Sequence, residues 1–164
     1  ALPISYVLAM MNAGEVLDTI VHSVHVPDDE LAKPYLRPLY DEPEFVVRNV
    51  WRQFGGWWDG APSRVKPAPD AALATELAAL AGGPAALADR AAALSEAGEH
   101  RLACHLADLA GWAAPDDPGI HTQRAIVYRN RRAVEPSLMA KGIFAGAARE
   151  SEAVAATIGD IDAG

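Results

Sequence analysis

The chain has 164 residues with a formal net charge of −8, and 51% of its residues are hydrophobic, a composition typical of a folded globular domain. An acidic chain repels phosphate backbones, which argues against a nucleic-acid partner. No apolar run approaches the roughly 20 residues that span a membrane, so we expect no membrane association. The single cysteine, Cys104, cannot form an internal disulfide, which fits a reducing compartment and favours the cytoplasm.

The first sixty residues predict three helices. Apolar residues at the spacing of one helical face mark two of them, the first carrying Ile4, Val7, Leu8 and Met11 and the second Leu17, Ile20, Val21 and Val24. Three prolines between Ala32 and Pro43 predict an extended loop. A third helix opens at Glu44 and places Val47, Val50, Trp51 and Phe54 on its inner face. Because the chain begins without methionine on a hydrophobic segment, we expect it to be an internal part of a longer protein.

A proline-rich linker over residues 61–69 separates this part from a second set of helices over residues 70–152. Leucines at helical spacing mark them, in the stripes Leu73/Leu77/Leu80, Leu87/Leu94 and Leu102/Leu106/Leu109. The loose match of Leu94, Gly98 and Ala110 to a tetratricopeptide hairpin predicts close antiparallel helices. Residues 153–164 are small and polar and predict a flexible tail. No segment alternates like a strand, so the predicted fold is all-α.

Two groups of histidines are candidate metal-binding or catalytic residues. His22 and His25 lie on one side of the second helix, but two histidines make an incomplete zinc site, and polar positions on an amphipathic helix are the preferred interpretation. His100, Cys104 and His105 resemble a Cys–His nucleophile without an orienting group or an oxyanion hole. We therefore interpret Cys104 as a small buried hydrophobe and predict no complete metal or catalytic site in this segment.

Three further patterns favour a structural role. The basic cluster of Arg124, Arg129, Arg131 and Arg132 is able to bind an anion, although a solvated helix face paired with nearby carboxylates is the preferred interpretation. The pair Gly142 and Gly146 predicts close helix packing in a soluble fold. The aromatic cluster of Trp51, Phe54, Trp57 and Trp58 predicts a core or an interface between two copies rather than a ligand pocket.

The stretch Arg48–Gly60, RNVWRQFGGWWDG, followed by Ala61-Pro62, resembles the KAVYQRYLGWFDGNP type of stretch in class III alkyl sulfatases. Further short runs match that family in the same order. GGPAAL (82–87) resembles GGADAVL, and AGEHRLA (97–103) resembles EGDYRWA. APDDP (114–118) resembles ADPDN, and GAARE (146–150) resembles GAQEL. The resemblance extends over roughly residues 40–150, most of the chain, with these runs as its clearest matches.

The family consists of zinc-dependent hydrolases in which a helical dimerisation domain follows a metallo-β-lactamase-fold catalytic domain. The resemblance implies that this chain is the dimerisation domain, forms a homodimer, and contacts the catalytic domain of its parent chain, which holds the zinc. It also places Tyr40, Glu44 and Arg48 on a wall of the active site. The family's zinc-binding histidine of this loop falls on Phe45, which makes the neighbouring Glu44 a candidate oxygen ligand.

These observations together predict N-terminal helices over residues 1–60, followed by tetratricopeptide-like dimerisation helices. The segment alone is expected to have no catalytic activity and no cofactor, whereas the parent is expected to hydrolyse sulfuric esters with zinc. The first alternative is a stand-alone tetratricopeptide-like module that binds other proteins. The second alternative is a self-sufficient enzyme that uses Cys104 and a histidine.

Overall fold

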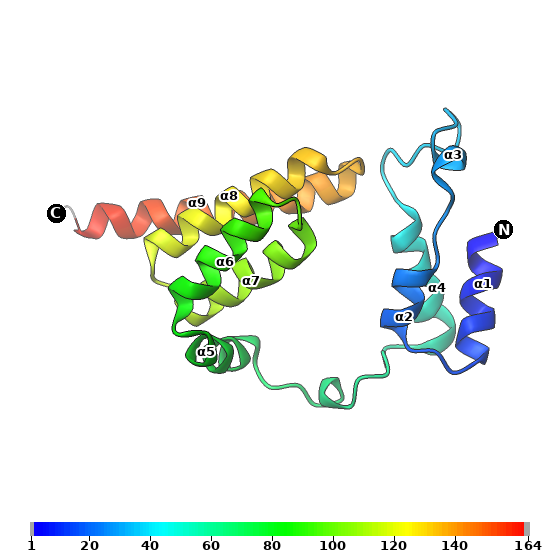
Figure 1. The fold of residues 1–164 in the computed structure, drawn as a ribbon, viewed down its shortest axis with the longest axis horizontal. Coiled ribbons are helices and arrows are strands. Elements are labelled where there is room, and N and C mark those ends of the chain that lie inside the picture. The colour runs from blue at the N-terminus through cyan, green and yellow to red at the C-terminus, as the bar shows by residue number, and fades with distance from the viewer. Residues whose placement is uncertain (1, 163–164) are drawn as a thin grey trace. The chain divides into compact units, whose positions relative to one another are not determined.

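The computed structural model describes residues 2–162, with side chains for residues 4–157. All regular structure in this part of the chain is helical, which confirms the predicted all-α class. The chain forms two compact units, shown in Figure 1. The first contains residues 1–67 together with 136–139, and the second contains residues 68–135 and 140–164.

The first unit consists of α1 (Leu2–Asn12), α2 (Leu17–Ser23), α3 (Asp28–Leu31), α4 (Pro43–Gly55) and the 3-10 turn η1 (Pro62–Arg64). Helices α1 and α2 pack against α4. Their shared core comprises Val7, Ile20, Val21, Val47 and Val50. The short helix α3 lies just before the loop predicted from the three prolines. Its first turn contains the acidic residues Asp28, Asp29 and Glu30, whose negative charges are stabilised by the positive end of the helix dipole.

A close backbone approach ties the end of α4 to the start of α2. Gly60 has φ +97°, and a Cβ on this residue would overlap the side chain of Val16. The Leu17 amide donates to the Asp59 carbonyl oxygen at 3.3 Å across the same contact. Only glycine fits this position, because both the positive φ and the space next to Val16 exclude a side chain.

The second unit is formed by α5 (Asp70–Ala81), α6 (Pro84–Glu96), α7 (His100–Ala113), α8 (Pro118–Val134) and all but the first two residues of α9 (Leu138–Asp162). Helix α7 packs against α5, α6 and α8. Proline at the first position of α6 and α8 starts these helices without losing a hydrogen bond. At α8 the Asp117 carboxylate also accepts from the amides of Gly119 and Ile120, at 2.9 and 3.0 Å.

Alanines form most of the contacts between these helices. In α5, Ala74 and Ala78 are buried, whereas Leu73 and Leu80 of the predicted stripe lie on the outer side. Buried alanines also occur in α6, α7 and α8, together with larger residues such as Leu87, Ile120 and Val127; they are Ala88, Ala91, Ala103, Ala107, Ala110 and Ala125. Helices whose facing residues are small approach each other more closely than helices with leucine at the contact. The second unit therefore has a narrow interior and leaves several leucines outside it.

The last helix continues through residues that the sequence assigns to a flexible tail. Residues 153–162 belong to α9, while 163 and 164 lie outside the described residues. The prediction of close packing at Gly142 and Gly146 is wrong within this chain, because a Cβ at either position would meet nothing within 4 Å. In the described part of the chain no single helix is long and apolar enough to cross a membrane; α5 and α6 meet that criterion only as a pair bent by 86°.

Candidate functional surfaces

The outer side of α5 is an exposed leucine face, which we define as Leu73, Leu77 and Leu80. Leu73 is 52% exposed and Leu80 is 85% exposed, while Leu77 is half-buried. The helix carries only two charged residues, Asp70 and Glu76. Exposed leucines at helical spacing on one helix are characteristic of a surface that is covered by another molecule or domain.

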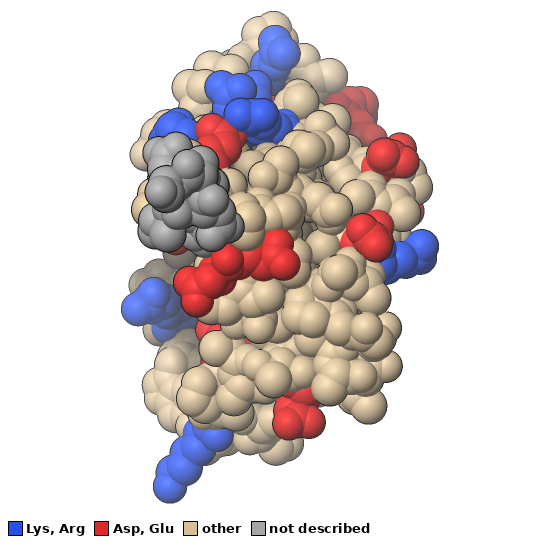
Figure 2. Space-filling model, turned by 90° about the vertical axis from the view of Figure 1, so that its left-hand side faces the viewer, with Lys and Arg blue, Asp and Glu red and all other residues tan. Residues whose placement is uncertain are grey.

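Other large apolar side chains are exposed on the second unit. They are Leu102 and Trp112 on α7, Ile126 and Val134 on α8, and Ile143 on α9. In the face drawn in Figure 2 the charged side chains are scattered, and large areas carry neither Lys, Arg, Asp nor Glu. A single exposed apolar side chain is ordinary. Several large exposed apolar side chains on a unit whose interior contains many alanines indicate that these side chains serve external contacts.

The predicted active-site wall lies on the first unit. Tyr40 is 66% exposed, and the side chains of Glu44 and Arg48 form an ion pair with 3.3 Å between Oε1 and Nη2. The Glu44 side chain is 23% exposed and that of Arg48 is 53% exposed. A partly exposed pair one helical turn apart contributes well under about 1 kcal/mol to stability, so stability alone does not require it.

An open groove of about 370 Å³ lies on the same unit; its lining includes the sequence neighbours of Tyr40 and Glu44 but not Tyr40, Glu44 or Arg48 themselves. Its apolar lining comes from α3, the following loop and α4, and includes Leu31, Leu36, Leu39 and Val46. The charged residues that line it are Arg37, Asp41 and Glu42. Sequence reasoning did not single out these three residues, because no spacing rule places Leu31 of α3 and Val46 of α4 in one groove across a proline-rich loop.

The aromatic cluster divides into an inner and an outer part. Trp51 packs against the valine core of the first unit, and its indole Nε1 donates to the Trp58 carbonyl oxygen at 3.0 Å. The rings of Trp57 and Trp58 meet edge to face, with 6.2 Å between their centroids. Phe54 and Trp57 are 60% and 74% exposed. The outer part of the cluster is therefore a second apolar surface.

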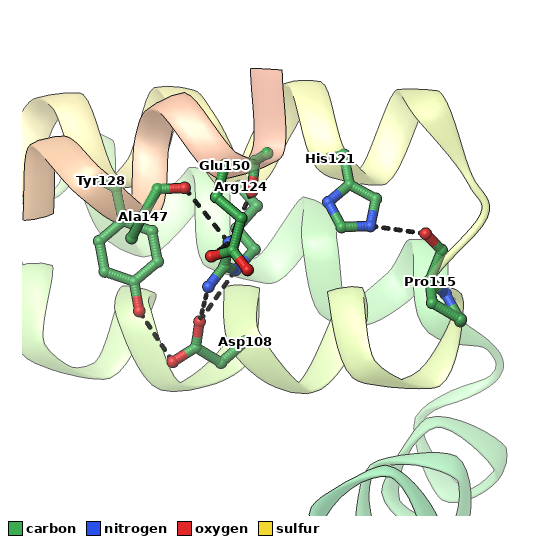
Figure 3. A network of polar contacts seen from close by, with 8 residues as sticks. Asp108, Pro115, His121, Arg124, Tyr128, Ala147 and Glu150 are labelled. Atoms are coloured by element: carbon green, nitrogen blue, oxygen red, sulfur yellow. Dashed lines mark hydrogen bonds and ion pairs between the residues drawn. The ribbon is translucent and has the colours of Figure 1, made fainter. Parts of the chain in front are cut away.

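A buried polar network joins α7, α8 and α9 (Figure 3). Nε and Nη2 of Arg124 each lie 2.9 Å from Asp108 Oδ1, and Nη1 donates to Ser151 Oγ at 2.6 Å and to the Ala147 carbonyl oxygen at 3.3 Å. The Tyr128 hydroxyl donates to the other oxygen of Asp108 at 2.8 Å. Burial and the neighbouring carboxylate raise the pKa of Tyr128, so the phenol keeps its proton and remains a donor.

The preferred interpretation of the arginine cluster as a solvated face is wrong for two of its members. The Arg124 side chain is only 12% exposed, and Gly111 makes room for it, since a Cβ there would lie 3.2 Å from Arg124 Cδ. The Arg131 side chain is 18% exposed and pairs with the buried Glu135 at 2.7 Å, while its guanidinium lies over the Phe144 ring. Arg129, 61% exposed in its pair with Glu152, does fit the predicted solvated face. These cations hold helices together and are already paired.

Neither histidine group forms a site. His22 is exposed and contacts only Asp18 of its own helix. Burial raises the pKa of Cys104 to about 11, which keeps the thiol protonated and unreactive near neutral pH. Within the described residues, no group of three or more His, Cys, Asp or Glu side chains is arranged to hold a metal ion.

Exposed apolar side chains on a helical domain are characteristic of a surface that packs against another domain or chain. The family model for the alkyl sulfatase dimerisation domain matches residues 16–153, and the chain belongs to this family. Over 123 residues it is 32% identical to a linear primary-alkylsulfatase of Pseudomonas sp. (strain ATCC 19151). That match covers 74% of this chain and 23% of the relative, so the chain spans about a quarter of that protein's length.

Solved structures of sec-alkyl sulfatases share the fold. A double mutant of the sec-alkyl sulfatase PisA1 is 22% identical with a TM-score of 0.83, and the alignment covers 92% of this chain and 24% of that one. The stereoselective inverting sec-alkylsulfatase Pisa1 from Pseudomonas sp. is 21% identical with a TM-score of 0.81, covering 91% and 24%. The structural similarity therefore includes the helical arrangement of nearly the whole chain.

Proposed function

We propose that this chain is the homodimerisation module of a longer hydrolase resembling alkyl sulfatases, and that a second copy covers the leucine face of α5. The observation that carries the proposal is the exposure of Leu73 and Leu80 on α5, a helix whose inner side is formed by Ala74 and Ala78. Membership of a dimerisation family favours a second copy as the partner.

The exposed leucines contribute to the driving force for association. Covering Leu73 and Leu80 contributes roughly 1–2 kcal/mol each, and a permanent dimer commonly buries about 2,000 Å² in total. Few charges have to be desolvated, because Asp70 and Glu76 are the only charged residues of α5. The remaining exposed residues of α7 and α8 extend the apolar area available to a partner.

Replacing both Leu73 and Leu80 by glutamate is expected to convert the dimer to a monomer without unfolding the chain, because both side chains lie on the outer side of α5. Sedimentation equilibrium at micromolar concentration should give twice 17.3 kDa for the native chain and 17.3 kDa for the variant. Like charges facing each other across a shared interface oppose association.

The matched control carries glutamate at Ala85 and Ala93, two exposed positions of α6, and should remain dimeric. If the native chain itself sediments as a monomer, the homodimer proposal fails. If the leucine variant stays dimeric like the native chain, self-association stands but uses another surface.

In the longer protein we propose that zinc held by a metallo-β-lactamase-fold domain supports ester hydrolysis, and that Tyr40, Glu44 and Arg48 form one wall of that active site. The described residues of this chain include no complete metal site, and the family resemblance assigns the main zinc ligands to the catalytic domain, with Glu44 as a candidate ligand from this chain. The groove on the same unit as this wall, with its apolar lining and Arg37, supports a role for this surface beyond structure.

Replacing Glu44 by glutamine in the full-length protein keeps the shape of the side chain and removes its charge. If Glu44 contributes to the active site, turnover or zinc content should fall while the melting temperature is nearly unchanged, because the Glu44–Arg48 pair is partly exposed. The control is Glu152→Gln, which removes the carboxylate of another surface ion pair, with Arg129. Native turnover and native zinc content in Glu44→Gln would show that the pair is only a contact on the helix surface.

A further inference from the structure

The groove-forming loop of the first unit is held by residues that follow it by almost a hundred positions. The Leu138 amide donates to the Leu39 carbonyl oxygen at 2.8 Å, and the Met139 amide lies 3.4 Å from the Tyr40 carbonyl oxygen. The hydroxyl of Ser137 donates to the same Tyr40 carbonyl oxygen at 2.6 Å across 97 positions. Ser137 is completely buried, although the surrounding loop residues Leu39 and Tyr40 are exposed.

These contacts satisfy two sets of backbone groups at once. The first amides of a helix have no partner within the helix, and here those of α9 bind carbonyl groups of the loop. The loop in turn lies outside any helix or strand, so its carbonyl oxygens have no partner within a regular element. Leu39 lines the groove, as do Leu36, Arg37 and Asp41 from the same loop.

We propose that residues 136–139 are a clasp that holds the loop 35–41 in its groove-forming conformation, and that release of the clasp opens the groove. The clasp acts on the backbone of the loop, which leaves the side chains of Leu36, Arg37 and Leu39 free to line the groove. It belongs to the first unit together with the loop that it holds. The proposal does not depend on self-association or on the reaction of the longer protein.

Two substitutions remove the clasp bonds in different ways. Ser137→Ala deletes the hydroxyl that binds Tyr40. Leu138→Pro deletes the amide that binds Leu39, at the first position of α9, where proline is compatible with a helix and where the native side chain is 61% exposed. In Ser137→Ala, hydrogen exchange at the Leu138 and Met139 amides should become about tenfold faster, as expected for loss of one buried hydrogen bond. In both variants chymotrypsin should cleave faster after Leu36, Leu39 and Tyr40.

The control is Ser95→Ala, which removes another buried serine hydroxyl, one that accepts from Asn130 in the second unit. It should leave exchange and cleavage in the first unit unchanged. Native exchange and native cleavage in both clasp variants would overturn the proposal. It would also be overturned if α1, α2 and α4 lost protection together with the loop, since the contacts would then hold the whole unit rather than the groove.

Discussion

Replacing Arg124 by alanine is expected to lower the free energy of unfolding of the second unit by about 3 kcal/mol. The side chain of Arg124 is 12% exposed and that of Asp108 is 22% exposed, so the substitution leaves a carboxylate in a poorly solvated position without its cation. It also removes the donor to Ser151, which is completely buried on α9. Tyr128 remains as a donor to Asp108 and limits the loss. Urea denaturation followed by circular dichroism measures the effect.

Arg129→Ala is the matched control on the same helix. Arg129 pairs with Glu152 of α9 as well, but its side chain is 61% exposed and that of Glu152 is 38% exposed. Solvent screens such a pair, and its loss should cost less than about 1 kcal/mol. Equal effects of the two substitutions would show that burial of Arg124 contributes nothing to stability, which would contradict the role assigned to the network.

Enlarging Ala103 to leucine is expected to destabilise the second unit by about 3 kcal/mol, at the upper end of the usual cost of overpacking. Ala103 is completely buried and shares a cluster with Ala91, Ala107 and Val127 from three helices. Three additional carbon atoms require these helices to separate or require Leu94 and Leu106, which pack against the cluster, to move. Thermal or urea denaturation should show the loss.

The control is Ala93→Leu on the exposed side of α6, where the same enlargement meets solvent. Its effect should stay within about 0.5 kcal/mol, because leucine and alanine differ little in helix propensity. A tolerated leucine at residue 103 would mean that the contact between α6, α7 and α8 is not closely packed.

Several helix ends are predictable from the sequence because local rules determine them. Pro84 and Pro118 start helices, and Gly82 ends α5 with φ +94°. The side of α5 that faces inward follows a different rule. Hydrophobic periodicity marks the leucines, but the close contact with α6 and α7 selects Ala74 and Ala78, and periodicity cannot rank a small residue above a large one.

Prediction of the candidate site is limited in the same way, because local sequence rules find contacts within one helix but not contacts between helices. The Glu44–Arg48 pair is four residues apart on one helix, and a spacing rule finds it. Burial of Arg124 depends on Gly111 of α7 and on Ser151 of α9, which are 13 and 27 positions away. A cluster of arginines on one helix contains no information about either partner, and the default expectation of a solvated face was therefore wrong for Arg124 and Arg131.

The clasp also constrains the order in which the protein is made. Helices α5 to α8 contact one another over short sequence separations, and such units fold quickly and from one end of the chain. The loop 35–41 leaves the ribosome early, but its hydrogen-bonding partners Ser137 and Leu138 follow roughly a hundred residues later. Since synthesis adds about 5–20 residues per second, several seconds pass before Ser137 and Leu138 can bind the carbonyl groups of the loop. The first unit is thus completed only after residues 136–139 have been made, and a nascent chain that ends before residue 137 carries an unfinished groove.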